Sequence, residues 1–224
     1  THAYIANQAG ESLNYIAGTI FCDLGNFVSL YKKEIDFSHK NMAGFAKYLE
    51  KQKYNKDFIE GIKAHIKLDH YVHKFYVIPV SIKLAKKTHL DNVNVFHHMA
   101  EVYVARRILR EYPSFMRVVR RAAKLSNNLV LKKHLVDYYK GVPIIEMFDA
   151  AYRETMSNKM TILHQIRGAW RFRKYLAHAT GAIGWQFIKS IRKVFKELYF
   201  ELRGSDKDLE RWIDYQRDEI SKIK

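Results

Sequence analysis

The chain of 224 residues lacks several features that would restrict its fold or compartment. It contains one cysteine, Cys22, which excludes an internal disulfide framework and permits a reducing compartment. This cysteine follows an apolar run, and we expect it to pack as a small hydrophobic side chain rather than to act as a nucleophile. No stretch reaches the roughly 18 unbroken apolar residues of a transmembrane helix. No signal peptide is recognisable, so we expect a cytoplasmic location if no leader has been removed.

Residues that interrupt helices are also scarce. The chain has three prolines (Pro79, Pro113 and Pro143) and no Asn-Gly or Asp-Gly pair of the kind that closes β-hairpins. Apolar residues recur at helical spacing over 5–16, 42–49, 58–76, 93–109, 115–125, 144–152, 162–176, 183–202 and 209–223. The sequence therefore predicts an all-α fold: a compact, single-domain multi-helix bundle over 1–224. Residues 18–40 lack a sustained helical period, and we expect an irregular loop with short helical pieces there.

Charge of one sign is abundant. The formal net charge is +16, and most of the excess lies in residues 102–224, which hold 26 Lys and Arg against 13 Asp and Glu. Each basic residue alone is best explained as part of a solvated helix face. Together with interleaved aromatic residues, the basic half at 106–224 suggests a partner that is anionic. An anionic membrane surface and a nucleic-acid backbone both fit this composition.

Histidine and carboxylate residues concentrate in the other half, 1–105. They include His65-x3-Asp69-x3-His73 and His97-x3-Glu101. Residues four apart lie on one face of a helix, so each set directs its side chains to one place. Imidazole and carboxylate together are the ligands of zinc and similar ions, so we expect a central metal site in the helical bundle. The alternatives are a hydrogen-bonded core histidine at His65, and His70 as the ligand in place of His73.

Five short elements follow one another in this half of the chain. They are Thr1-His2, Gly18-Thr19-x3-Asp23, Ser38-His39, Gly61-x3-His65-x3-Asp69 and His97-x3-Glu101. In this order they resemble the zinc-dependent phospholipase C family, which includes the alpha-toxin type and whose superfamily contains single-strand nucleases. The resemblance covers residues 1–105. The chain departs from the family at Thr1, where the family has tryptophan, and in the narrow spacing between Asp69 and His73.

The resemblance implies a cluster of two or three zinc ions. Its ligand sets are Asp23, His39, His65 and Asp69 for the first ion, His73, His97 and Glu101 for the second, and His2 and Asp69 for the third. It also implies that Asp23 orients or deprotonates the attacking water, unless it is a ligand only.

The expected function is therefore hydrolysis of a phosphodiester by a zinc-dependent enzyme of the phospholipase C type, with a phospholipid or related phosphodiester as substrate. A metal-dependent nuclease or phosphatase is the alternative enzyme. A basic helical module that binds membrane or nucleic acid without catalysis is the alternative outside enzymes.

Overall fold

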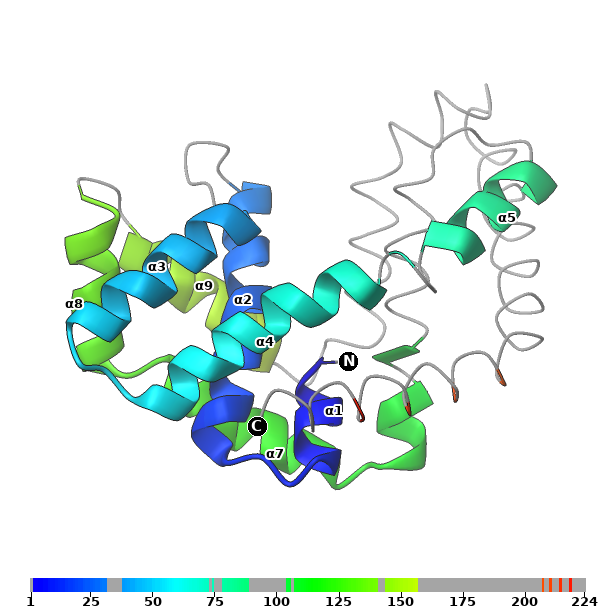
Figure 1. Cartoon of the computed structure of the whole chain (residues 1–224), viewed down its shortest axis with the longest axis horizontal. Coiled ribbons are helices and arrows are strands. Elements are labelled where there is room, and N and C mark those ends of the chain that lie inside the picture. Colours follow the sequence, from blue (N-terminus) through cyan, green and yellow to red (C-terminus); the bar gives the residue numbers. More distant parts are fainter. Residues whose placement is uncertain are drawn as a thin grey trace. The chain divides into compact units, whose positions relative to one another are not determined.

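The structure, a computed structural model, describes residues 2–31, 38–72, 74, 78–88, 104–105, 107–140 and 144–156, together with residues 207, 210, 214 and 218. The helices with assigned bounds are α1 (His2–Gln8), α2 (Leu13–Tyr31), α3 (His39–Lys51), α4 (Lys56–Val72), α5 (Ile78–Thr88), α7 (Phe115–Ser126), α8 (Leu129–Tyr138) and α9 (Ile144–Met156). These ranges contain no strand, and the prediction of an all-α multi-helix fold is confirmed. None of the helices described is both long and apolar enough to cross a membrane. Figure 1 shows the labelled helices.

The chain divides into two compact units. The first comprises Thr1–His70, Glu111–Asn158 and Gln216–Lys224, and the second comprises Tyr71–Arg110 and Lys159–Tyr215. Helices α1, α2, α3, α7, α8 and α9 lie in the first unit, with all of α4 except its last two residues. A single helical domain over 1–224 stays a prediction.

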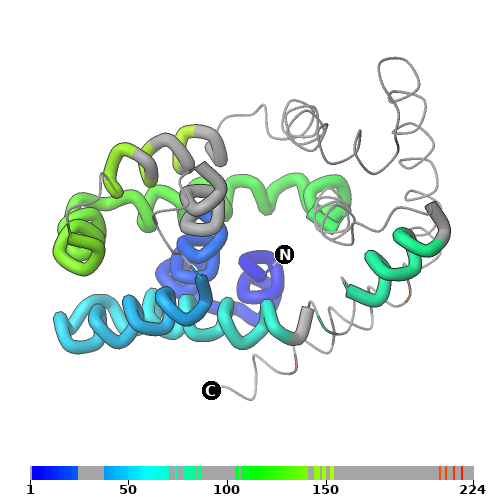
Figure 2. The backbone as a smooth tube through the Cα atoms, turned by 90° about the horizontal axis from the view of Figure 1, so that it is seen from above, coloured from blue at the N-terminus to red at the C-terminus, as the bar shows by residue number. Residues whose placement is uncertain are grey.

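Helix α2 lies at the centre of the first unit. It contacts α1, α7 and α9 directly. The Phe21 ring of α2 lies 5.6 Å from that of Phe45 on α3, 5.6 Å from that of Phe58 on α4 and 5.3 Å from that of Phe148 on α9. All four rings are buried, so one aromatic cluster joins four helices. The smooth trace in Figure 2 shows α2 among these helices from a second direction.

The prediction of one helix over 5–16 and a loop over 18–40 is wrong in its boundaries. Helix α1 ends early because Gly10 adopts a φ of +74°, and the Glu11 amide then donates to the Ala6 carbonyl. This is the glycine-terminated end that closes many helices. A new helix, α2, runs without a break from residue 13 to residue 31. Buried helices are apolar on most sides, and they therefore show no clear period.

Two further helices were not expected. Helix α5 contains Pro79 in its first turn, where a missing amide hydrogen costs no helical hydrogen bond. Helix α8 begins after Asn128, whose side-chain oxygen accepts from the Leu131 amide at 2.8 Å. The expected helices at 42–49, 58–76, 115–125 and 144–152 correspond to α3, α4, α7 and α9. Those at 162–176 and 183–202 lie outside the described residues, as does most of 93–109 and of 209–223.

Helices α2 and α4 cross at two glycines. A Cβ atom added at Gly18 would collide with the Phe58 carbonyl oxygen, and one added at Gly61 would collide with the Tyr15 carbonyl oxygen. Both neighbours are backbone atoms, which cannot move aside as a side chain does. The absence of a side chain at both positions therefore allows the two backbones to touch. Because His65 lies one turn beyond Gly61, this crossing also positions that imidazole against α2.

Candidate metal centre

Five of the predicted ligands come together in the first unit. Helix α1 supplies His2, α2 supplies Asp23, α3 supplies His39 as its first residue, and α4 supplies His65 and Asp69. Two groups of three have ligand atoms that all lie within 4.8 Å of one another: His2, Asp23 and His65, and His39, His65 and Asp69. Four helices therefore contribute donors to these groups, and the imidazole of His65 belongs to both groups.

Asp69 faces a different imidazole with each of its oxygens. Its Oδ1 lies 3.9 Å from Nε2 of His2, and its Oδ2 lies 3.3 Å from Nε2 of His39. Asp69 is buried, and so is His2. A buried carboxylate needs compensation by donors or a cation. Asp69 belongs to the group of His39 and His65, and its Oδ1 also faces His2 of the other group.

His65 is fully buried and lies among the other imidazoles. Its exposed fraction is 0%, and its ring centroid is 4.4 Å from that of His2 and 5.8 Å from that of His39. Within the described part of the chain, neither ring nitrogen of His65 has a hydrogen-bond partner. Burial lowers the pKa of His65, and it outweighs the opposite effect of the Asp23 and Asp69 carboxylates. The imidazole is therefore neutral near pH 7, which is the form that ligates metal ions.

The cluster is open to solvent on one side. Asp23 is exposed, although its neighbours Cys22 and Leu24 are buried. The side chain of His39 is 37% exposed. His2, His65 and Asp69 form the buried side of the same cluster. A ligand from solution would therefore reach these residues first at Asp23 and His39.

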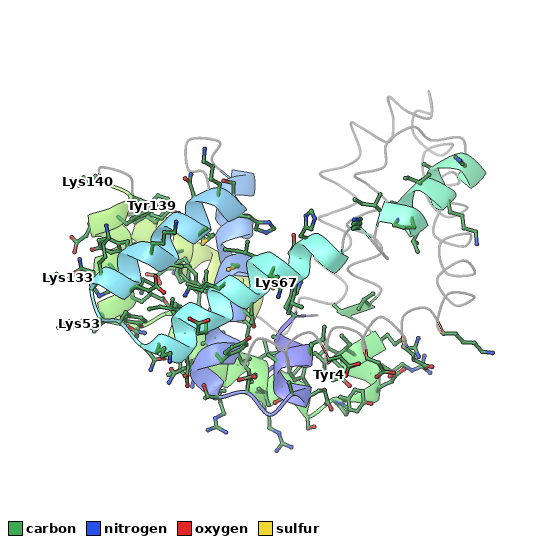
Figure 3. All side chains as sticks on the ribbon, viewed as in Figure 1. Tyr4, Lys53, Lys67, Lys133, Tyr139 and Lys140 are labelled. Atoms are coloured by element: carbon green, nitrogen blue, oxygen red, sulfur yellow. The ribbon has the colours of Figure 1, made fainter. Side chains whose placement is uncertain are left out.

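Lys67 lies away from the cluster, as the helical spacing predicts. It is exposed, whereas His65 and Asp69, two residues to either side, are buried. Figure 3 labels it on α4. On a helix these positions diverge by about 160°, so one face of α4 carries the ligands and the other carries the lysine.

The remaining predicted ligands have a different status. His73, His97 and Glu101 lie outside the described residues, so their assignment to an ion stays a prediction. His70, the alternative to His73, is exposed and belongs to neither group of three formed by the described residues.

Asp23 falls in one group with His2 and His65. The resemblance implied that it shares an ion with His39, His65 and Asp69, and this assignment to a particular ion stays a prediction. Helical spacing relates residues on one helix, and among the described residues α2 contributes Asp23 alone to the cluster. The position of α2 against α1 therefore decides this grouping.

The donor set fits a divalent ion such as zinc. It consists of three imidazoles and two carboxylates, and nitrogen with oxygen ligands suits zinc. An imidazole buried without a hydrogen bond costs about 1–3 kcal/mol. A cation held at His65 would accept its lone pair and remove part of that cost. The donor set is therefore one that could hold a metal ion.

Cys22 lies directly beside this cluster and takes no part in either group. It is 1% exposed, and its Sγ lies 3.7 Å from the Gly18 carbonyl oxygen and 4.0 Å from that of Ile62. Burial raises the pKa of the Cys22 thiol well above its ordinary value, and the charges of Asp23 and Asp69 raise it further. The thiol therefore stays protonated and packs as a small hydrophobic group.

Comparison of the chain with protein-family models, with curated proteins and with solved structures finds no match.

Proposed function

We propose that the chain is a zinc-dependent phosphodiester hydrolase of the phospholipase C type. The observation that supports this most directly is the environment of His65. This buried imidazole has no hydrogen-bond partner among the described residues, and two carboxylates and two further imidazoles surround it. Buried polar groups in proteins are nearly always satisfied. A resident cation supplies the missing partner.

The cluster's charge favours an anionic substrate once ions are bound. An imidazole that binds a metal ion is uncharged, so the two carboxylates would set a formal charge of about −2, which one divalent ion neutralises. A second divalent ion would leave a positive site that attracts phosphate. When bound, such ions lower the pKa of a coordinated water and neutralise charge on a phosphodiester. We therefore propose that the site holds two or three zinc ions.

The protein's own residues have separate roles in this scheme. Asp69, with one oxygen towards His2 and the other towards His39, links the two ligand groups. Asp23 is the exposed carboxylate, and it is placed to orient a water molecule or to accept its proton. The substrate is a phospholipid or a related phosphodiester. A nucleic-acid substrate remains the alternative for the same set of residues.

Metal content tests the proposal first. Protein purified with zinc present should contain at least about one zinc ion per chain, measured by elemental analysis after exhaustive dialysis. Asp69→Asn should lose zinc and turnover together, because the amide carries no charge to hold an ion. The matched control is Asp137→Asn, which makes the same change at an exposed carboxylate on α8. Wild-type protein with less than one ion per chain contradicts the proposal.

A substrate comparison then separates the enzyme classes. The zinc-loaded chain should hydrolyse phosphatidylcholine or bis-nitrophenyl phosphate faster than it cleaves single-stranded DNA. The reverse order identifies a nuclease that uses the same cluster. Hydrolysis of a phosphomonoester alone identifies a phosphatase. Bound zinc without turnover of any of these substrates identifies a structural metal site.

A further inference from the structure

Helix α8 exposes apolar side chains that the core does not need. Leu129 is 83% exposed and Val130 is 59% exposed, the two highest values among large apolar residues in the described ranges. The opposite side of α8 already fills the interior, because Leu131 and Leu135 are fully buried. Folding therefore gains nothing from leucine at 129, and exposed apolar groups that are grouped together usually mark a binding surface.

These side chains share one stripe of the helix. Positions 129, 133 and 136 are separated by four and three residues, so they lie on one face, and Val130 lies beside the first of them. Val136 is 41% exposed. Lys133 lies between the two ends of the stripe and is exposed. We name Leu129, Val130, Lys133 and Val136 the α8 outer face.

Lysines border this face. Lys124 is exposed at the end of α7, just before the turn into α8, and Lys140 is exposed just beyond the end of α8. Lys53 lies in a turn and is followed by Tyr54. The ring of Tyr54 lies 5.5 Å from that of His134 on α8, so this turn is next to the helix. Figure 3 labels Lys53, Lys133 and Lys140 in this part of the first unit.

One acidic residue, Asp137, is also exposed on α8. It lies about 12 Å along the helix axis from Leu129 but one turn from Lys133, so it offsets part of the charge there and leaves the four lysines in excess.

We infer that the α8 outer face docks on an anionic phospholipid bilayer. Leucine and valine side chains enter the boundary between headgroups and acyl chains, while the surrounding lysines contact lipid phosphates and carboxylates. A second copy of the chain fits less well, because its lysines would meet those of the first copy. Nucleic acid fits less well too, because lysines would contact its phosphates but the leucine and valine side chains offer no aromatic ring on which bases stack.

This surface acts independently of the metal cluster. None of its residues belongs to either ligand group, and its lipid contacts need no ion. Asp69→Asn should therefore bind vesicles as the wild type does. Failure of vesicle binding leaves the proposed hydrolase standing, and failure of metal binding leaves the docking surface standing.

A single labelled cysteine tests the docking surface. Leu129→Cys provides a thiol at an exposed position, whereas the native Cys22 is 1% exposed, so an environment-sensitive dye should react at 129 alone. The unmutated chain serves as the labelling control. Dye emission should shift to shorter wavelength when vesicles of phosphatidylcholine with phosphatidylserine are added. Dye at Lys67→Cys, on α4, should show no such shift.

Vesicle sedimentation of the full chain gives the energetic test. The double variant Leu129→Ser with Val130→Ser should lower the vesicle partition coefficient at least about tenfold. Lys133→Glu should lower it about fivefold or more, and raised salt should weaken binding of the wild type. The matched control is Lys67→Glu, which makes the same charge change away from α8 and should leave the coefficient nearly unchanged.

Several results would overturn the inference. One is equal binding to vesicles of phosphatidylcholine alone, since the lysines would then have no role. Another is a dye shift at 129 that depends on protein concentration without vesicles, which identifies a second copy as the partner. A shift of the dye emission with single-stranded DNA in place of vesicles would identify nucleic acid as the partner. No shift when anionic vesicles are added would exclude the bilayer.

Discussion

At the scale of the residue, the buried imidazole of His65 lowers the free energy of unfolding when no cation is present. The imidazole is fully buried, and neither of its nitrogens has a hydrogen-bond partner among the residues described. Its burial also lowers its pKa, so protonation gives no relief at neutral pH. A site of this kind is expected where function rather than stability determines the residue. The change in stability when this imidazole is replaced, with and without zinc, therefore tests whether it binds a cation.

Replacement of this imidazole should separate stability from metal binding. His65→Leu should leave the zinc-free chain as stable as the wild type or up to about 2 kcal/mol more stable, because it removes an unsatisfied polar group of similar size. The same variant should lose the rise in thermal midpoint that zinc gives the wild type. Thermal unfolding with and without zinc, followed by circular dichroism, measures both effects.

His70→Leu is the control for this change. It lies on the same helix and makes the same substitution, but its side chain is exposed and outside both ligand groups. Its zinc-dependent shift should equal that of the wild type. A zinc-dependent shift that survives in His65→Leu would remove His65 from the ligand set.

At the scale of the element, the crossing of α2 and α4 connects packing to the site. Gly18 and Gly61 let two backbones touch, and one turn beyond Gly61 the same face of α4 carries His65. The Gly61-x3-His65-x3-Asp69 spacing then has a physical meaning. Gly61 sets how closely α4 approaches α2, and His65 and Asp69, which follow at one-turn intervals, lie on the face of α4 that carries the cluster.

Gly61→Ala should therefore harm both stability and metal affinity. The added methyl group would collide with the backbone of Tyr15, and such overpacking typically costs about 1–3 kcal/mol. The accompanying shift of α4 would move His65 from Asp23, so zinc affinity should fall by more than the loss of stability explains. Denaturant unfolding and zinc titration measure the two quantities.

Gly44→Ala on α3 is the matched control for the crossing. There the new methyl group would meet the hydroxyl end of Tyr138, which can move aside. The gain in helix propensity of about 1 kcal/mol should offset most of the remaining cost. Equal losses in the two variants would show that the α2–α4 crossing has no special role.

The sequence predicts helices well where one face is apolar and poorly where the helix is central. Helices α3 and α7 show a clear period because each has a solvated face. The apolar residues of α2 show no clear helical period because residues 15–22 are all buried. The glycines of this helix also resemble loop signals. At the site, spacing on α4 correctly pairs His65 with Asp69. Spacing cannot relate Asp23 to His2, since their distance depends on how α1 packs on α2.

At the scale of the whole molecule, the candidate ligands divide between the two units by chain position. The five that the structure describes belong to the first unit, and positions 73, 97 and 101 fall in the range 71–110 of the second. The second ligand set, His73, His97 and Glu101, stays a prediction, and it can be tested separately from the described cluster.

The number of ions should thus fall by steps. The triple variant His73→Ala, His97→Ala and Glu101→Gln should bind about one zinc ion fewer per chain than the wild type, yet retain the ion at His65. At a zinc concentration a hundredfold above the dissociation constant, that retained ion should still stabilise the chain by about 2.7 kcal/mol. Hydrogen exchange should then show zinc-dependent protection of α1 and α4 in both proteins. Unchanged zinc content in the triple variant would remove the second ligand set, whereas loss of all zinc would show that the described cluster does not hold an ion by itself.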